Sequence, residues 1–159
     1  MSTADDANKE RIVVGVDGSE ESRAALRWAA EEATLRLADL EAVLVWERPL
    51  RWLFGPPGTA AVPPTPLIDQ QKVERRASEV LAETVQQTFG DDPPPALKQV
   101  VVEGNPAAVL VARSLDASML VLAAQGHGRL GGVDLGSTVE KCLRLARCNV
   151  IVIRPAREG

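Results

Sequence analysis

The sequence predicts an α/β protein with a parallel sheet that is covered by helices on both faces. Short runs rich in Val, Ile and Leu recur along the chain, and they are too uniformly apolar to be strands with one solvated face. Stretches with apolar residues at helical spacing separate them. Because strands and helices alternate, consecutive strands are expected to run parallel. With 159 residues, 45% of them hydrophobic, the chain is long enough for one well-buried domain and too short for two.

The first strand and the first helix follow a polar N-terminus. Residues 1–10 are expected to be a disordered tail, and the single domain to cover residues 11–155. Residues 11–17 are apolar and β-branched, which favours a strand. Ser19 is placed to cap a helix that continues to about Leu37, with two glutamates in its first turn.

A second strand and a long loop come next. Residues 41–46 form another apolar run, and residues 48–67 then contain six prolines, which exclude a regular helix or a central strand. A loop of this length in a compact domain is uncommon and is often functional. Its apolar triplet, Trp52 to Phe54, either packs down to anchor the loop or covers a ligand or partner surface.

The second and third helices of the pattern are separated by a short strand. Residues 69–89 have helical periodicity, and the Gly90 turn with the prolines after it ends this longest helix. Residues 97–102 form the third strand. Asn105 can cap a helix that has proline at its first position and continues to about Leu115.

The last part of the chain contains the stretch that we expect to bind a ligand. A buried strand at 119–123 leads into a glycine-rich loop, and Gly136 opens a helix that continues to about Ala146. A loop with so few side chains lets backbone N–H groups approach a ligand, and the start of a helix attracts phosphate. The final strand is expected at 149–153, with Pro155 ending the ordered chain.

Composition limits the kinds of binding partner and the location that we expect for this protein. A net charge of −4 and scattered basic residues argue against nucleic acid, which requires a concentrated basic face. The N-terminus lacks the apolar core of a signal peptide, and no apolar run approaches the ~20 residues that cross a membrane. We therefore expect a cytoplasmic protein without a membrane partner. Cys142 and Cys148 have neither zinc nor disulfide spacing and are expected in the core or an interface.

The position of the small-residue loops predicts the sheet order. Ligands of parallel sheets bind beyond the carboxyl ends of the strands, where the strand order reverses. The loops at 15–19 and 123–132 follow the first and fourth strands, so these strands are expected to be neighbours. The simplest Rossmann-like order that satisfies this is 3-2-1-4-5.

Common phosphate and catalytic motifs do not account for the glycine loop. Residues 126–131 match G-x-G-x-x-G, but they follow the fourth strand and precede their helix by five residues. Ser137 stands where a P-loop requires lysine. No nucleophile, base and orienting group come together, and the lone histidine, His127, is expected to be a solvated or ligand-side donor. We therefore expect no enzyme, with at most slow incidental ATP hydrolysis.

A family resemblance accounts for the same residues. Gly126, nine residues and Gly136-Ser137 are similar to the G-x2-G-x9-G-[S/T] signature of the universal stress protein family. Residues 12–19, 102–106 and 146–154 also resemble the family's first strand and turn, its third-strand corner and its closing strand. The resemblance covers about residues 11–155. It implies the 3-2-1-4-5 sheet and a homodimer formed through strand 149–153, which a wholly apolar edge strand supports.

The resemblance also implies an adenine-nucleotide site. Asp17 corresponds to the acidic residue near the adenosine, and Gly126, Gly136 and Ser137 to the phosphate-binding positions. Ala123 stands where the signature has its first glycine, and its added methyl group narrows the part of the site that would hold the ribose. The full set of expected binding residues is Gly15, Val16, Asp17, Val45, Ala123, Gly126, His127, Gly128, Arg129, Gly136, Ser137 and Thr138.

Three functions follow as alternatives. The first is an ATP-binding regulatory or sensing module of the stress response, with Mg²⁺ accompanying ATP and with no metal site made by protein alone. The second is a dimeric interaction protein without nucleotide, in which residues 126–136 only make tight turns. The third is an enzyme acting on an adenylate-type substrate. Asp17, Ser137 and Thr138 have a simpler structural explanation as helix caps.

Overall fold

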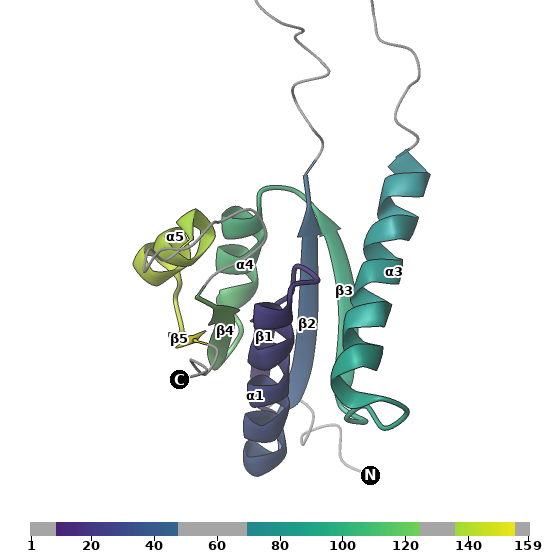
Figure 1. Ribbon diagram of the computed structural model, residues 1–159. Helices are drawn as coiled ribbons and strands as arrows, with labels where there is room; N and C mark the ends of the chain where they lie inside the picture. Colours follow the sequence, from purple (N-terminus) through teal and green to yellow (C-terminus); the bar gives the residue numbers. More distant parts are fainter. Residues whose placement is uncertain (1–8, 48–69, 125–135, 155–159) are drawn as a thin grey trace, which may run out of the picture.

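The sheet has the predicted order. The structure is a computed structural model that describes residues 9–47, 70–124 and 136–154. Five strands form one sheet in the order β3-β2-β1-β4-β5, and each neighbouring pair is parallel (Figure 1). The strands are β1 (Arg11–Gly15), β2 (Asp39–Trp46), β3 (Leu97–Glu103), β4 (Met119–Ala123) and β5 (Asn149–Ile153).

Helices cover both faces of this sheet. They are α1 (Glu20–Arg36), α3 (Gln70–Phe89), α4 (Pro106–Ser114) and α5 (Ser137–Leu145). Helices α1 and α3 lie on one face, and α4 and α5 on the other (Figure 1). Side chains alternate between the two cores, so that Ile12 and Val14 pack on the α1 side and Val13 packs on the α4 side, all fully buried. The continuous apolar runs in the sequence are explained by this two-sided burial.

The predicted helix caps are confirmed at two positions. The Ser19 hydroxyl accepts a hydrogen bond from the Ser22 N–H at 3.1 Å. The Asn105 side chain accepts one from the Ala108 N–H at 3.1 Å, with proline at the first helical position. Each cap satisfies a donor that the first helical turn leaves without a partner.

Several element boundaries differ from the predicted ones. Strand β1 ends at Gly15 rather than at residue 17, because the Asp17 carboxylate folds the chain into a turn by accepting the Ser19 N–H at 2.9 Å. Strand β2 begins two residues early, where the Asp39 N–H donates to the Glu10 carbonyl at 2.8 Å. The same bond places Glu10, predicted to belong to the tail, beside the sheet.

The remaining boundary changes are at helix ends. Helix α1 ends at Arg36, and Leu37 follows in the left-handed conformation with φ of 54°. Helices α4 and α5 each end one residue before the predicted position, and the chain is extended at Ala146. Of the described helices, α3 is the longest at 20 residues, as predicted. Residues 1–8 and the whole proline-rich stretch at 48–67, including its apolar triplet, lie outside the described residues.

Candidate functional site

A pocket of about 320 Å³ opens at the carboxyl edge of the sheet. The ends of β1, β2 and β4 and the start of α5 form its walls. It brings together eight of the predicted binding residues, which are Gly15, Val16, Asp17, Val45, Ala123, Gly136, Ser137 and Thr138. The other four predicted residues, 126–129, lie outside the described parts of the chain.

Asp17 organises the corner between β1 and α1. One carboxylate oxygen, Oδ1, accepts hydrogen bonds from the Ser19 N–H at 2.9 Å and the Ser19 hydroxyl at 2.5 Å. The Ser22 hydroxyl lies 3.4 Å from the Asp17 N–H and donates to the Ser19 carbonyl at 2.9 Å. The expectation that Asp17 itself caps α1 is therefore wrong, because Ser19 is the cap and Asp17 orients it. Asp17 remains exposed at the pocket.

Gly15 is required by the packing around it. A Cβ at this position would lie 2.8 Å from Leu122 Cδ2 and 3.3 Å from Leu110 Cδ1. Contacts below 3.0 Å force neighbouring atoms to move, and in a close-packed core such movement is costly. Gly15 therefore leaves room for the ends of the Leu122 side chain of β4 and the Leu110 side chain of α4, which would have to shift to admit a Cβ. Core packing accounts for this glycine independently of any ligand.

Gly136 has a different environment. Among the described residues, a Cβ here would meet nothing within 4 Å, and its φ of −55° is one that any residue adopts. It is the N-cap of α5 and provides no side-chain cap, so the expected capping by Ser137 or Thr138 is wrong. The first N–H groups of a helix have no partner within it and carry positive partial charge. These donors open toward the pocket, where they suit a phosphate group.

Sequence reasoning missed part of the pocket wall. Pro106 and Leu110 of α4 contribute to it, as do Val43 and Leu122 of the sheet. The contribution of Val43 could have been predicted from the sequence, because strand alternation places it on the same face as Val45. No sequence pattern predicts the contribution of α4, since it depends on how closely that helix packs against Gly15.

A second hollow, of about 440 Å³, lies between the end of β2 and the first half of α3. Leu44, Trp46 and Val73 line it, and Lys72 stands among the lining residues. It shares Asp17 with the first pocket, so the two hollows meet at the corner between β1 and α1.

The described residues form neither a metal-binding cluster nor a membrane-spanning helix. In the ranges 9–47, 70–124 and 136–154, no three His, Cys, Asp or Glu residues are grouped to hold a metal ion. Within the same ranges, no helix is both long and apolar enough to cross a membrane.

Comparison with known proteins adds to this geometry. A family model described as the universal stress protein family matches residues 9–154. The chain belongs to the universal stress protein family. Universal stress protein Rv2623 of Mycobacterium tuberculosis is 36% identical over 143 residues, which are 90% of this chain and 44% of that protein. A universal stress protein of Mycolicibacterium smegmatis is 33% identical over 148 residues, 92% of this chain and 49% of that protein. This universal stress protein thus spans less than half the length of these curated relatives.

Solved structures share the fold. UspA from Lactobacillus plantarum has a TM-score of 0.69 and 26% identity, with 91% of this chain and 97% of that chain covered. A universal stress protein from Archaeoglobus fulgidus, solved in complex with dAMP, has a TM-score of 0.58 and 24% identity over 91% of this chain and 97% of that one. A third structure, a universal stress protein in complex with cAMP, has a TM-score of 0.53 and 21% identity, with 91% of this chain and 95% of that chain covered.

Proposed function

We propose that this universal stress protein binds an adenine nucleotide, ATP with Mg²⁺, in the pocket at the carboxyl edge of the sheet and acts as a regulatory or sensing module. The observation that carries the proposal is Gly136. Neither packing against the described residues nor backbone conformation requires glycine there, yet it stands at a helix start that faces a pocket. A ligand that must come close to the backbone explains the missing side chain.

The pocket residues divide into two groups with different chemistry. Val43 and Val45 offer an apolar wall for a base, and the exposed Asp17 carboxylate can accept hydrogen bonds from sugar hydroxyls or base amines. Ser137 and Thr138 provide hydroxyls beside the N–H groups of α5, which suit a phosphate. The glycine loop at 126–129 is proposed to complete the phosphate site, with His127 and Arg129 as donors.

Other universal stress proteins support the class of ligand. Two structural neighbours were solved with cAMP and with dAMP, so related folds hold adenine nucleotides. Among the described pocket residues, Asp17 is the one charged side chain, so a phosphate there would be held by N–H groups and hydroxyls. Beyond Arg129 of the glycine loop, such a site has no evident base or cationic clamp for hydrolysis. We therefore propose a regulatory role and at most slow ATP turnover.

The alternative is a nucleotide-free dimeric interaction protein of the same fold. Strand β5 supports it, because it is an edge strand with four consecutive apolar residues that are half-buried. An edge strand of this kind pairs readily with another strand. We propose that two copies associate through β5 in either case, so the nucleotide is what separates the two functions.

The substitution Gly136→Asp tests the proposal. Aspartate is a good N-cap and favours the positive end of a helix, so stability is expected to stay the same or rise. The same carboxylate occupies the proposed phosphate position and repels it. We expect ATP affinity measured by calorimetry to fall at least about tenfold, which corresponds to about 1.4 kcal/mol. Ser78→Asp, an exposed change of equal charge on α3, should leave the affinity unchanged.

Nucleotide titration of the wild-type protein distinguishes the two functions. Saturable heat with ATP, AMP or cAMP, lost in Gly136→Asp but kept in Ser78→Asp, supports the nucleotide site. No heat and no thermal stabilisation at millimolar nucleotide would eliminate it, since a ligand at 100 times its Kd adds about 2.7 kcal/mol of stability. A dimer without nucleotide binding would then support the interaction protein.

A further inference from the structure

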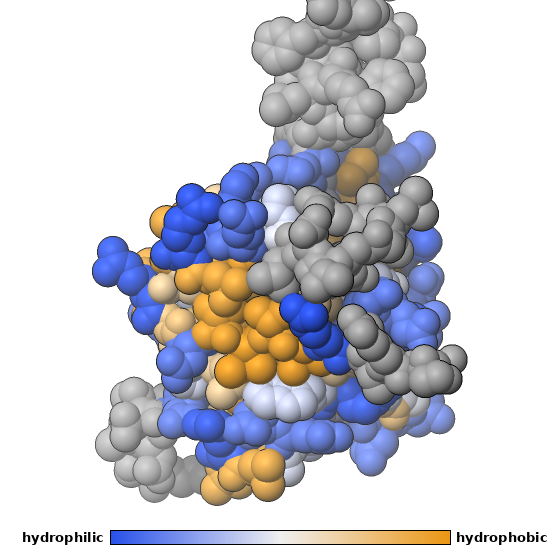
Figure 2. Space-filling view, turned by 60° about the vertical axis from the view of Figure 1, so that its left-hand side comes forward, coloured by the Kyte–Doolittle hydropathy of each residue, from blue (hydrophilic) through white to orange (hydrophobic). Residues whose placement is uncertain are grey.

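Two buried serines lie beside the proposed nucleotide pocket. Hydrophilic residues cover most of the side of the molecule in Figure 2, around an apolar patch. Among the described residues, five polar or charged ones are buried, and they are Ser19, Ser22, Glu41, Thr84 and Ser114. Glu41 pairs with two arginines, and the Thr84 hydroxyl donates to the Val80 carbonyl of its own helix at 2.7 Å. Ser19 and Ser22 lie together at the start of α1, where Ser22 lines the pocket.

The two serines hold Asp17 in place. The Ser19 hydroxyl accepts the Ser22 N–H at 3.1 Å and donates to Asp17 Oδ1 at 2.5 Å, and the Ser19 N–H donates to the same oxygen at 2.9 Å. The Ser22 hydroxyl donates to the Ser19 carbonyl at 2.9 Å and lies 3.4 Å from the Asp17 N–H. A carboxylate oxygen offers about two acceptor positions, so the chain uses both positions of Oδ1, and a ligand donor would meet Oδ2.

Helix capping alone does not explain this network. As the N-cap, Ser19 needs only an oxygen that accepts the Ser22 N–H. Neither the hydrogen bond donated to Asp17 nor the Ser22 hydroxyl is part of that cap, and serine inside a helix is less favourable than alanine. Asp17 is exposed, and an exposed side chain that no neighbour holds exchanges rapidly between rotamers. The two serines therefore restrict a side chain that would otherwise be free to rotate.

We propose that Ser19 and Ser22 are positioning residues of the nucleotide site, which hold the Asp17 carboxylate in its binding orientation before the ligand arrives. This inference rests on the proposed nucleotide binding. A side chain that is already fixed in the free protein loses no rotamer freedom on binding, and for one side chain the expected gain in affinity is about three- to tenfold. The first turn of α1 thereby becomes part of the site.

Ser22→Ala and Ser114→Ala are a matched pair that tests this. Each hydroxyl is buried, donates to the carbonyl three residues earlier, and faces a backbone N–H outside its helix, that of Asp17 for Ser22 and that of Arg147 for Ser114. Ser114 ends α4, whereas the pocket is lined by the first half of that helix. Urea unfolding should show similar losses of stability in the two variants. In calorimetry, the affinity for ATP should fall about three- to tenfold in Ser22→Ala and stay unchanged in Ser114→Ala.

Variants of Ser19 separate orientation from capping. Aspartate is as good an N-cap as serine, but it has no hydrogen to donate to Asp17, and its charge repels that carboxylate. Ser19→Asp should therefore keep α1 folded and lower the affinity for ATP about tenfold. Ser19→Thr retains the hydroxyl and should bind as wild type. In an Asp17→Ala background, Ser22→Ala should cause no further loss of affinity, because Ser22 acts through Asp17.

The outcomes separate the inference from the proposed function. A wild-type protein that binds no nucleotide overturns both. If the wild type binds, equal losses of affinity in Ser22→Ala and Ser114→Ala overturn the inference alone, because binding would then respond to stability in general. Unchanged affinity in Ser22→Ala and Ser19→Asp also overturns it. Additive losses from Asp17→Ala and Ser22→Ala do so as well, because Ser22 would then act independently of Asp17.

Discussion

Cys142 is a packing residue with a thiol that stays protonated. It lies fully buried on α5, where the sequence predicted a core or interface position, and Cys148 packs partly buried against the same core. Burial is the main cause that raises the pKa of Cys142 from an ordinary value of 9.0 to about 11, and the nearby Cys148 thiol adds to it. Burial also raises the pKa of Cys148. Both thiols are therefore neutral and poorly nucleophilic at neutral pH.

The raised pKa of Cys142 predicts a loss of stability at high pH. Between pH 9 and about 11 the native thiol keeps its proton while the unfolded one releases it, so the native state binds more protons and the free energy of unfolding falls as pH rises. Below pH 9 this group contributes no slope. Urea unfolding across this window should show a steeper decline for the wild type than for Cys142→Ala. Parallel declines in the two proteins would contradict the assignment, because lysines and other groups titrate equally in both.

Glu41 ties three elements together at the amino end of the sheet. It stands on β2 and is only 5% exposed. Its carboxylate oxygens pair with Arg113 of α4 and, at 3.2 Å, with Arg11 of β1. Arg11 also donates to the Arg113 carbonyl at 3.1 Å. The cluster explains how a charged residue is accommodated in an otherwise apolar strand.

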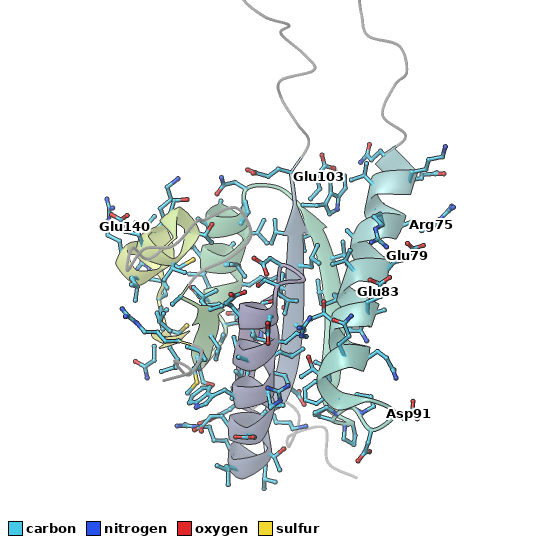
Figure 3. The ribbon with its side chains drawn as sticks, in the orientation of Figure 1. Arg75, Glu79, Glu83, Asp91, Glu103 and Glu140 are labelled. Atoms are coloured by element: carbon cyan, nitrogen blue, oxygen red, sulfur yellow. The ribbon has the colours of Figure 1, made fainter. Side chains whose placement is uncertain are left out.

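Glu41→Gln is expected to destabilise the fold without affecting the ligand site. Losing a buried charge leaves both arginines without their partner, and because they are about 30% exposed we expect a cost of about 1–3 kcal/mol in chemical denaturation. The exposed pair of Arg76 with Glu79 gives a control, since Glu79→Gln should cost less than about 0.5 kcal/mol. Figure 3 labels Glu79 on α3. Nucleotide affinity should be unchanged in both. A cost equal to that of the control would mean that the cluster contributes no net stability.

Sequence patterns predicted the elements better than their boundaries. Apolar runs and cap residues located all five strands and the two confirmed caps, because these signals are local. The end of β1 was wrong because one carboxylate, that of Asp17, redirects the chain. Gly15 was predicted from its position to bind ligand, whereas its contacts with Leu110 and Leu122 come from residues about a hundred positions away. Packing between residues so far apart in the sequence produces no periodic pattern from which it could be predicted.

The proposed nucleotide pocket and the β5 edge are connected by backbone hydrogen bonds. The Gly136 N–H donates to the Ala124 carbonyl at 3.3 Å, and the Ala124 N–H donates to the Ile153 carbonyl at 2.9 Å. Helix α5 makes a second connection, since it begins at the pocket and its end leads within three residues into β5. A ligand seated at Gly136 therefore touches the same structural unit that would pair two copies.

This connection predicts that nucleotide binding strengthens dimerisation. A phosphate at the start of α5 adds negative charge on the side of Ala124 and Ile153, next to which the exposed Arg154 stands, and so reduces repulsion between the positive β5 ends of two copies. We expect saturating ATP to lower the dimer dissociation constant about fivefold at low salt, a coupling of about 1 kcal/mol. Linkage requires dimerisation to raise ATP affinity in turn. Because a dimer carries two sites, a fivefold change in its dissociation constant corresponds to about a twofold rise in affinity at each site, so sedimentation with and without ATP can be compared with calorimetry above and below the dimer dissociation constant. Arg154→Glu should lose most of the coupling, because the positive charge that the phosphate offsets is then absent. Coupling that persists undiminished in this variant would mean that it is transmitted by the hydrogen bonds through Ala124 rather than by charge.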